Sequence, residues 1–189
     1  MTAMITPISI NPDTGLLEPV TFYASPHQDE RPLVMPIDMI VIHGISLPKG
    51  EFGSDNIRDF FCGSLDFAAH PSFADIATLR VSAHLLIQRT GEIIQFVPFV
   101  KRAWHAGESC FAGRTRCNDF SIGIELEGTD DHPYEDIQYQ QLGAVINLLR
   151  QTYPDIKKDR IVGHVDIAPE RKTDPGPAFD WENLKGRLA

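Results

Sequence analysis

The sequence predicts an α/β fold: a single domain in which a mixed central β-sheet is flanked by helices. Three observations predict it. Short apolar runs of the kind found in buried strands recur along the chain, and one long segment has the 3–4 residue spacing of an amphipathic helix. Strand-like and helix-like segments also alternate, and a length of 189 residues corresponds to one domain of ordinary size.

The chain is expected to begin with an extended segment. Residues 1–36 contain six prolines and are predicted to form a proline-rich leader that packs on a domain comprising residues 37–189. Residues 37–42 are strongly apolar and are predicted to form a buried strand that stops at His43 and Gly44. The His43 side chain is therefore expected at the carboxyl end of a strand.

A short helix and a hairpin are predicted next. Ser54 can cap a helix whose apolar side chains stand at positions 57, 60 and 61. Residues 85–87 and 93–97 are apolar runs on either side of Thr90-Gly91. A glycine between two such runs is typical of a hairpin turn.

The second half of the chain predicts two more strands and two more helices. Residues 121–127 alternate between apolar and polar side chains, which predicts a strand with two different faces. Residues 133–153 have apolar positions at helical spacing, and Pro154 is expected to end this helix. Residues 160–163 are predicted to form a last short strand and residues 181–188 a last helix.

The charge balance disfavours two classes of partner. Seventeen lysines and arginines against 26 aspartates and glutamates give a formal net charge of −9. Non-specific binding to nucleic acid or to an anionic membrane requires the opposite sign. We therefore expect no nucleic acid and no membrane as partners. A small-molecule substrate and a monomer are expected as well, on grounds other than charge.

The start of the chain and the cysteines point to the cytoplasm. No basic residue precedes Arg31, so the positive region of a signal peptide is absent. No apolar run approaches the roughly 18 residues of a membrane span. The cysteines are odd in number and at no metal-like spacing, which is typical of a reducing compartment; they are Cys62, Cys110 and Cys117.

Two of the seven histidines share a context that the others lack. His43 follows one predicted strand and His164 follows another, and α/β sheets present functional side chains at the ends of their strands. Asp174 comes ten residues after His164, in a loop stiffened by Pro175 and Pro177. Two imidazoles and a carboxylate with one position left open make a catalytic zinc site. For any one of these histidines, a capped or core position remains the alternative.

Glu125 is the candidate general base. It shares a strand face with Gly123, which is expected to leave empty space beside the carboxylate. A carboxylate there could take a proton from an attacking water. Glu127 lies on the same face and competes for the role, and an exposed strand charge is the alternative for Glu125. The pattern alone does not separate the two.

Several segments resemble, in order and spacing, the zinc N-acetylmuramoyl-L-alanine amidases, whose fold is similar to that of the lysozyme of phage T7 and of the peptidoglycan recognition proteins. These segments are Val41-Ile42-His43, Ser82-Ala83-His84, Ala103-Trp104-His105-Ala106-Gly107, Ser121-Ile122-Gly123-Ile124-Glu125 and Gly163-His164-Val165-Asp166. Residues 102–107, 117–121 and 171–177 further resemble the cytoplasmic subgroup that recycles 1,6-anhydromuramyl peptides. The resemblance covers most of residues 36–181.

The resemblance implies a cofactor, a set of catalytic residues and a reaction. Zinc is the implied cofactor, with His43, His164 and Asp174 as its ligands. Glu125 matches the general base, and Lys172 matches the residue near the developing oxyanion. The implied reaction hydrolyses the amide between N-acetylmuramic acid, in its 1,6-anhydro form, and L-alanine, in peptidoglycan recycling.

The resemblance also implies contacts to the substrate. Trp104 and His105 match the wall of the substrate site, where the indole can pack against the sugar ring. Arg80 and Arg116 are candidates for the carboxylates of an acidic peptide stem, because a guanidinium can bind a carboxylate bidentately. Core packing remains the alternative for Trp104, and a solvated surface charge for the two arginines.

One position departs from the subgroup, and three other functions stay open. Gly44 stands where relatives usually have Asn, so a polar contact to the substrate is missing or is supplied elsewhere. A thiol amidase would use Cys110 or Cys117 with His105. A binding module of the same fold would hold muropeptides without cleaving them. A cell-wall amidase would act on intact peptidoglycan, although no export signal is evident.

Overall fold

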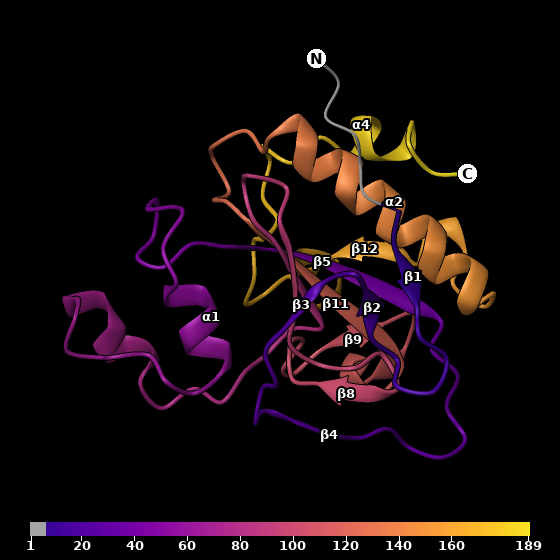
Figure 1. Ribbon diagram of the computed structural model, residues 1–189, viewed down its shortest axis with the longest axis horizontal. Helices are drawn as coiled ribbons and strands as arrows, with labels where there is room; N and C mark the ends of the chain where they lie inside the picture. Colours follow the sequence, from indigo (N-terminus) through magenta and orange to yellow (C-terminus); the bar gives the residue numbers. More distant parts are fainter. Residues whose placement is uncertain (1–6) are drawn as a thin grey trace.

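A six-stranded mixed sheet lies at the centre of the computed structural model, which describes residues 7–189 (Figure 1). The strand order is β12-β5-β11-β6-β7-β3. The first four strands run parallel, β7 is antiparallel to β6, and β3 is parallel to β7. In sheet order the bounds are Ile161–Gly163, Met39–Ile45, Ser121–Glu127, Leu85–Ile87, Ile93–Gln95 and Thr21–Phe22. The predicted α/β class and mixed sheet are confirmed.

One face of the sheet is covered by the two C-terminal helices. Helix α2 (Asp136–Thr152) lies along this face with α4 (Trp181–Lys185) beside it (Figure 1). Ile40 and Ile42 of β5 belong to the apolar cluster on this side, together with buried residues of α2 such as Leu142. Because successive strand residues point to opposite faces, Met39, Val41 and His43 point the other way.

The opposite face is covered by loops and short helices. Met39, Val41, Phe120, Val162 and Ile167 form a separate apolar cluster there. Helix α1 (Asn56–Phe61) and the 3-10 turn Pro71–Ile76 contribute to a further apolar cluster that includes Leu86 of β6 and Ile94 of β7. The other short helices are α3 (His164–Ile167) and 3-10 turns at Cys117–Asp119 and Lys158–Arg160. A small hairpin is formed by β9 (Cys110–Phe111) and β10 (Arg114–Thr115). No helix among residues 7–189 is long and apolar enough to cross a membrane.

Two strands differ from their predicted form. Strand β5 does not stop at residue 42, because its parallel ladder with β11 continues through the pair Glu125–His43 to Glu127–Ile45. All seven residues of β11 are buried, so the predicted difference between its faces is not one of exposure. On the polar face of β11, His105 packs against Gly123 and contacts the Ser121 hydroxyl at 3.1 Å. Arg160 belongs to a 3-10 turn rather than to β12.

The helices are confirmed, with corrections at their ends. Asp55, not Ser54, is the N-cap of α1, and the Ser54 hydroxyl instead accepts a hydrogen bond from the backbone N–H of Asn56 at 3.4 Å. Helix α2 begins at Asp136 with a capping box between Glu135 and Gln138, and ends before Pro154. Helix α4 ends at Lys185, before the predicted position 188.

The N-terminal segment is tied to the rest of the chain by main-chain pairing. The first six residues of the predicted leader lie outside the described residues. The remainder contains β1 (Ser9–Ile10), β2 (Leu17–Glu18), β3 and β4 (Gln28–Glu30). Strand β3 joins the central sheet, and β4 pairs with β8 (Lys101–Ala103).

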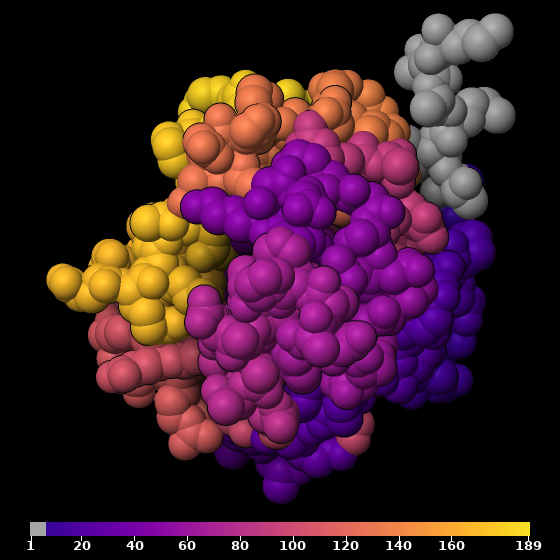
Figure 2. Space-filling model, turned by 90° about the vertical axis from the view of Figure 1, so that its left-hand side faces the viewer, coloured from indigo at the N-terminus to yellow at the C-terminus, as the bar shows by residue number. Residues whose placement is uncertain are grey.

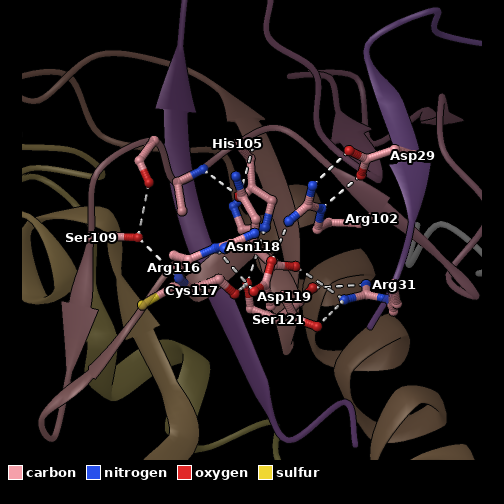
Figure 3. A network of polar contacts seen from close by, with 12 residues as sticks. Asp29, Arg31, Arg102, His105, Ser109, Arg116, Cys117, Asn118, Asp119 and Ser121 are labelled. Carbon is pink, nitrogen blue, oxygen red and sulfur yellow. Dashed lines mark hydrogen bonds and ion pairs between the residues drawn. The ribbon is translucent and has the colours of Figure 1, made fainter. Parts of the chain in front are cut away.

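Arg31 fastens this segment to the loop that precedes β11. Its guanidinium donates hydrogen bonds to the backbone oxygens of Asn118, Asp119 and Ser121, the last at 2.8 Å (Figure 3). It also donates to the backbone oxygen of Phe99 at 3.1 Å. Burial lowers the pKa of Arg31 to about 10, which still leaves the side chain charged at neutral pH. The residues just before β11 are therefore held in place from the N-terminal side.

Candidate metal centre and active site

Three side chains that are far apart in the sequence meet at the carboxyl edge of the sheet. His43 comes from β5, His164 from the start of α3 directly after β12, and Asp174 from the loop that follows. Strands β5 and β12 are parallel neighbours, so their carboxyl ends lie at one edge. The Nδ1 atoms of the two histidines are 2.9 Å apart, and they lie 3.2 and 3.1 Å from Oδ2 of Asp174.

The donor atoms of these three residues suit a divalent cation such as zinc. Their ligand atoms all lie within 4.8 Å of one another. Two imidazole lone pairs and a carboxylate oxygen at this separation repel one another unless a positive charge lies between them. Burial lowers the pKa of His43 to about 4, so the ring is in the neutral, metal-binding form at neutral pH. Although burial raises the pKa of Asp174, the adjacent His164 and His43 side chains hold it well below its usual range.

Glu125 lies beside this cluster and is buried. It is paired in register with His43 on the neighbouring strand, and its Oε2 has no hydrogen-bond partner among the described residues. Burial raises the pKa of Glu125 well above its ordinary value, the charge of Asp174 raises it further, and Lys172 lowers it. A buried carboxylate with a free oxygen and a raised pKa is suited to accepting a proton near neutral pH.

The structure distinguishes the surroundings of Glu127 from those of Glu125. Both oxygens of Glu127 accept backbone hydrogen bonds, one from Gly53 at 2.6 Å and one from Arg89 at 3.1 Å. Glu127 therefore connects β11 to two loops. Its oxygens are already engaged, whereas Glu125 keeps one free.

The space beside Gly123 is filled rather than empty, which corrects the expectation from the sequence. A Cβ atom on Gly123 would lie 2.3 Å from Cγ of His105, so the glycine makes room for this imidazole ring. His105 Nδ1 lies 3.0 Å from Nε2 of His43, and His105 Nε2 lies 3.1 Å from the Ser121 hydroxyl. His105 thus stands directly behind a candidate metal ligand.

A cavity of about 220 Å³ joins these groups to an apolar wall. On one side it is lined by His43, His105, Glu125, His164, Lys172 and Asp174. On the other it is lined by apolar side chains from α1 and the segment after it, among them Phe60, Phe61 and Leu79. Figure 2 views the molecule from the side on which the purple and magenta segment with α1 lies next to the yellow C-terminal segment.

Lys172 is placed to act on a negative charge in this cavity. Its side chain is half-buried, and its ammonium forms no ion pair within residues 7–189. The structure thus brings together the five residues that the sequence resemblance assigned to the metal and the catalysis.

The other predicted substrate residues lie farther from the cluster. Trp104 packs against His27, with ring centroids 6.0 Å apart, and is not among the residues that line the cavity. Arg80 is exposed and lines a smaller cavity of about 170 Å³ that shares Phe60 with the first. Arg116 is exposed, pairs with Asp119 at 3.3 Å and lines a different cavity.

The sequence did not point to Tyr134, which lies against Gly44. The Tyr134 hydroxyl donates a hydrogen bond to the backbone oxygen of Pro175 at 2.9 Å, so it holds the residue that follows Asp174. A Cβ atom on Gly44 would lie 2.2 Å from this hydroxyl oxygen. The glycine after His43 is therefore explained by a close approach between β5 and Tyr134; a tyrosine just ahead of a helix gave no sign of it.

We expect Gly44→Ala to destabilise the fold by about 1–3 kcal/mol, because the added methyl overlaps the hydroxyl of the buried Tyr134 side chain. Chemical denaturation would measure this loss. The matched background is Tyr134→Phe, in which the clashing oxygen is absent and the next ring atom, Cζ, is 3.5 Å from the new Cβ. The cost of Gly44→Ala should shrink in that background, and an unchanged cost would contradict the explanation.

Comparisons with known proteins agree on one family. A family model described as N-acetylmuramoyl-L-alanine amidase matches residues 33–177. The 1,6-anhydro-N-acetylmuramyl-L-alanine amidase AmpD of Escherichia coli (strain K12) is 62% identical over 161 residues, which are 85% of this chain and 87% of the relative. A crystal structure of a selenomethionine AmpD derivative matches with a TM-score of 0.91 at 56% identity, over 95% of this chain and 100% of that one.

A third similar protein was solved with a substrate. It is the N-acetylmuramyl-L-alanine amidase AmiD from E. coli, in complex with anhydro-N-acetylmuramic acid-L-Ala-D-gamma-Glu-L-Lys. It matches with a TM-score of 0.59 and 34% identity, over 84% of this chain and 60% of that one.

Proposed function

Because the chain belongs to the N-acetylmuramoyl-L-alanine amidase family, we propose that it hydrolyses the amide between the muramic acid and L-alanine of anhydromuramyl peptides, with one zinc ion, in peptidoglycan recycling. It is an enzyme of the hydrolase class with a small-molecule substrate. The observation that carries the proposal is the convergence of His43, His164 and Asp174 beside the unpartnered oxygen of Glu125, in one cavity.

We propose that each of five residues has a separate task. His43, His164 and Asp174 hold the metal, which when bound lowers the pKa of water to about 7 and so supplies a nucleophile at neutral pH. Glu125 accepts a proton from the attacking water and returns it to the leaving amine of L-alanine. Lys172 donates to the oxygen of the scissile carbonyl as negative charge develops on it, a contribution commonly worth about 3–4 kcal/mol.

The cavity suggests how the substrate is oriented. The apolar wall formed by α1 and Leu79 faces the polar cluster, so the lactyl and alanine methyl groups can pack there while the amide faces the metal ligands. A second cavity of about 380 Å³ shares Gly44, Lys172 and Asp174 with the first, and is lined by two further cations, Lys49 and Arg171. We propose that the acidic peptide stem lies along this second cavity.

Of the four substrate residues predicted from the sequence, we propose a contact for two. Arg80 lies at a cavity that shares Phe60 with the site, so we retain it as a contact to the outer part of the substrate. His105 lines the main cavity and can also touch the substrate. For Trp104 and Arg116 a substrate contact stays a prediction, because both lie outside the residues that line the main cavity.

We propose that the enzyme acts in the cytoplasm as a monomer, with residues 1–36 as a leader on the amidase domain of residues 37–189. The three cysteines are free, which supports a reducing compartment. The pairing of β3 with β7 supports a leader that folds together with the domain.

The experiment that tests the proposal is an assay with anhydromuramyl tripeptide before and after chelation. We expect the zinc-loaded chain to release free tripeptide, chelation to abolish the release, and added zinc to restore it. A chain that binds the substrate without releasing peptide would be a binding module. A chain that hydrolyses it regardless of chelation, but fails when all three cysteines are changed to Ser, would be a thiol amidase.

A further inference from the structure

In both His43 and His164, the ring nitrogen that faces away from the metal cluster is hydrogen-bonded. Nε2 of His164 lies 3.3 Å from the backbone oxygen of Ala106. A carbonyl oxygen can only accept, so this contact requires a proton on Nε2. A neutral His164 therefore presents the lone pair of Nδ1 to the cluster.

His43 reaches a backbone carbonyl through two intermediate side chains. Its Nε2 lies 3.0 Å from Nδ1 of His105, whose Nε2 lies 3.1 Å from the Ser121 hydroxyl. That hydroxyl donates to the backbone oxygen of Cys117 at 2.6 Å. Figure 3 shows His105, Ser121 and Cys117 in one network of polar contacts.

The Cys117 carbonyl sets the direction of each hydrogen bond in the series that runs from His43 through His105 and Ser121 to Cys117. Ser121 has one proton, and because it goes to Cys117, the hydroxyl must accept from Nε2 of His105. A neutral His105 then has a lone pair on Nδ1, which must accept from Nε2 of His43. A neutral His43 is left with its lone pair on Nδ1, the atom that faces His164 and Asp174.

We propose that Ser121 and His105 are positioning residues that set the tautomer of His43 for metal binding. The inference rests on the proposed function, because it assumes that the cluster binds zinc. The reverse tautomer would place a proton on the metal-facing nitrogen. It would also turn the Ser121 hydroxyl away from the Cys117 oxygen, and so break the 2.6 Å hydrogen bond between them.

The hydrogen-bonded series of His43, His105, Ser121 and the Cys117 carbonyl, or relay, is held in place by its surroundings. His105, Ser121 and Cys117 are all buried, and Gly123 leaves room for the His105 ring. Arg31 donates to the backbone oxygen of Ser121 from the N-terminal segment. The position of a candidate metal ligand thus depends in part on Ser121, Cys117 and Arg31, which do not line the main cavity.

Zinc affinity of three variants tests the relay. Ser121→Ala removes the hydroxyl that connects His105 to the Cys117 carbonyl. It should lower zinc affinity by about 10–100-fold, as is typical when the hydrogen-bond partner of a metal-ligating histidine is lost. Turnover should recover at saturating zinc. Ser121→Thr keeps the hydroxyl and should restore affinity. Ser109→Ala is the matched control, because the Ser109 hydroxyl contacts Cys117 N–H but lies outside the relay. Equal affinities for Ser121→Ala and Ser109→Ala would overturn the proposal.

Nitrogen-15 NMR of the wild-type imidazoles tests the relay without relying on a variant that folds. In the zinc-loaded chain we expect His105 to be protonated at Nε2 only, with coupling between its Nδ1 and Nε2 of His43 across the hydrogen bond. A proton on Nδ1 of His105 in a chain that takes up zinc would overturn the relay. A wild-type chain that takes up no zinc would instead contradict the proposed function.

Discussion

The Glu125→Gln variant is expected to keep its zinc and to lose about 10²–10⁴ in the rate of amide hydrolysis. Glutamine has the size of glutamate but cannot take a proton from the attacking water. Its effect should fall on kcat more than on KM, because Glu125 acts on the water and not on substrate binding. Steady-state kinetics together with metal analysis of the same sample would measure both consequences.

Glu127→Gln is the matched control for this variant. Glu127 lies two residues along the same strand face, but both its oxygens accept backbone hydrogen bonds from Gly53 and Arg89. Its replacement should lower the melting temperature and leave the rate close to that of the wild type. If Glu125→Gln lost the metal, Glu125 would be a ligand rather than a base.

The same residue predicts the acidic side of the pH profile. Burial, followed by the charge of Asp174, raises the pKa of Glu125 well above its ordinary value. A general base works only when it is deprotonated, so kcat/KM should fall as the pH falls through this raised pKa. The fall should therefore begin at higher pH than for an exposed carboxylate, and it should be missing from the residual activity of Glu125→Gln.

The Asp174→Ala variant is expected to lose zinc first and activity as a consequence. Asp174 supplies the only carboxylate of the three-residue cluster, and the ion would be left with two imidazoles. The loss of affinity should exceed the 10–100-fold that is typical for an outer hydrogen-bond partner. Competition with a chelator of known affinity would measure it. Asp131→Ala, at an exposed carboxylate, is the control, and a variant at Asp174 with wild-type affinity would contradict the assigned ligand set.

The elements that carry strong periodicity could be predicted from the sequence. Helix α2 and the hairpin of β6 and β7 follow from hydrophobic spacing and a turn glycine, which act locally. The convergence of His43 and His164 could also be anticipated, because both follow apolar strand segments and parallel strands end at one edge of a sheet. Asp174 could be anticipated as part of the set from its sequence context and the family resemblance.

The features that depend on packing could not be predicted. Gly44 and Gly123 are explained only by the side chains that approach them, Tyr134 and His105, which are distant in the sequence. The length of β5 depends on its pairing with β11, and pairing is not a local property. The environments of Glu125 and Glu127 differ only because loops donate hydrogen bonds to Glu127.

The central claim is that His43, His164 and Asp174 bind one zinc ion. The most direct test is anomalous diffraction at the zinc absorption edge from crystals of the zinc-loaded chain. The account predicts a single strong peak at about 2.0–2.2 Å from Nδ1 of both histidines and from an oxygen of Asp174. A peak at a cysteine, or at histidines outside this cluster, with none between the three residues, would contradict it.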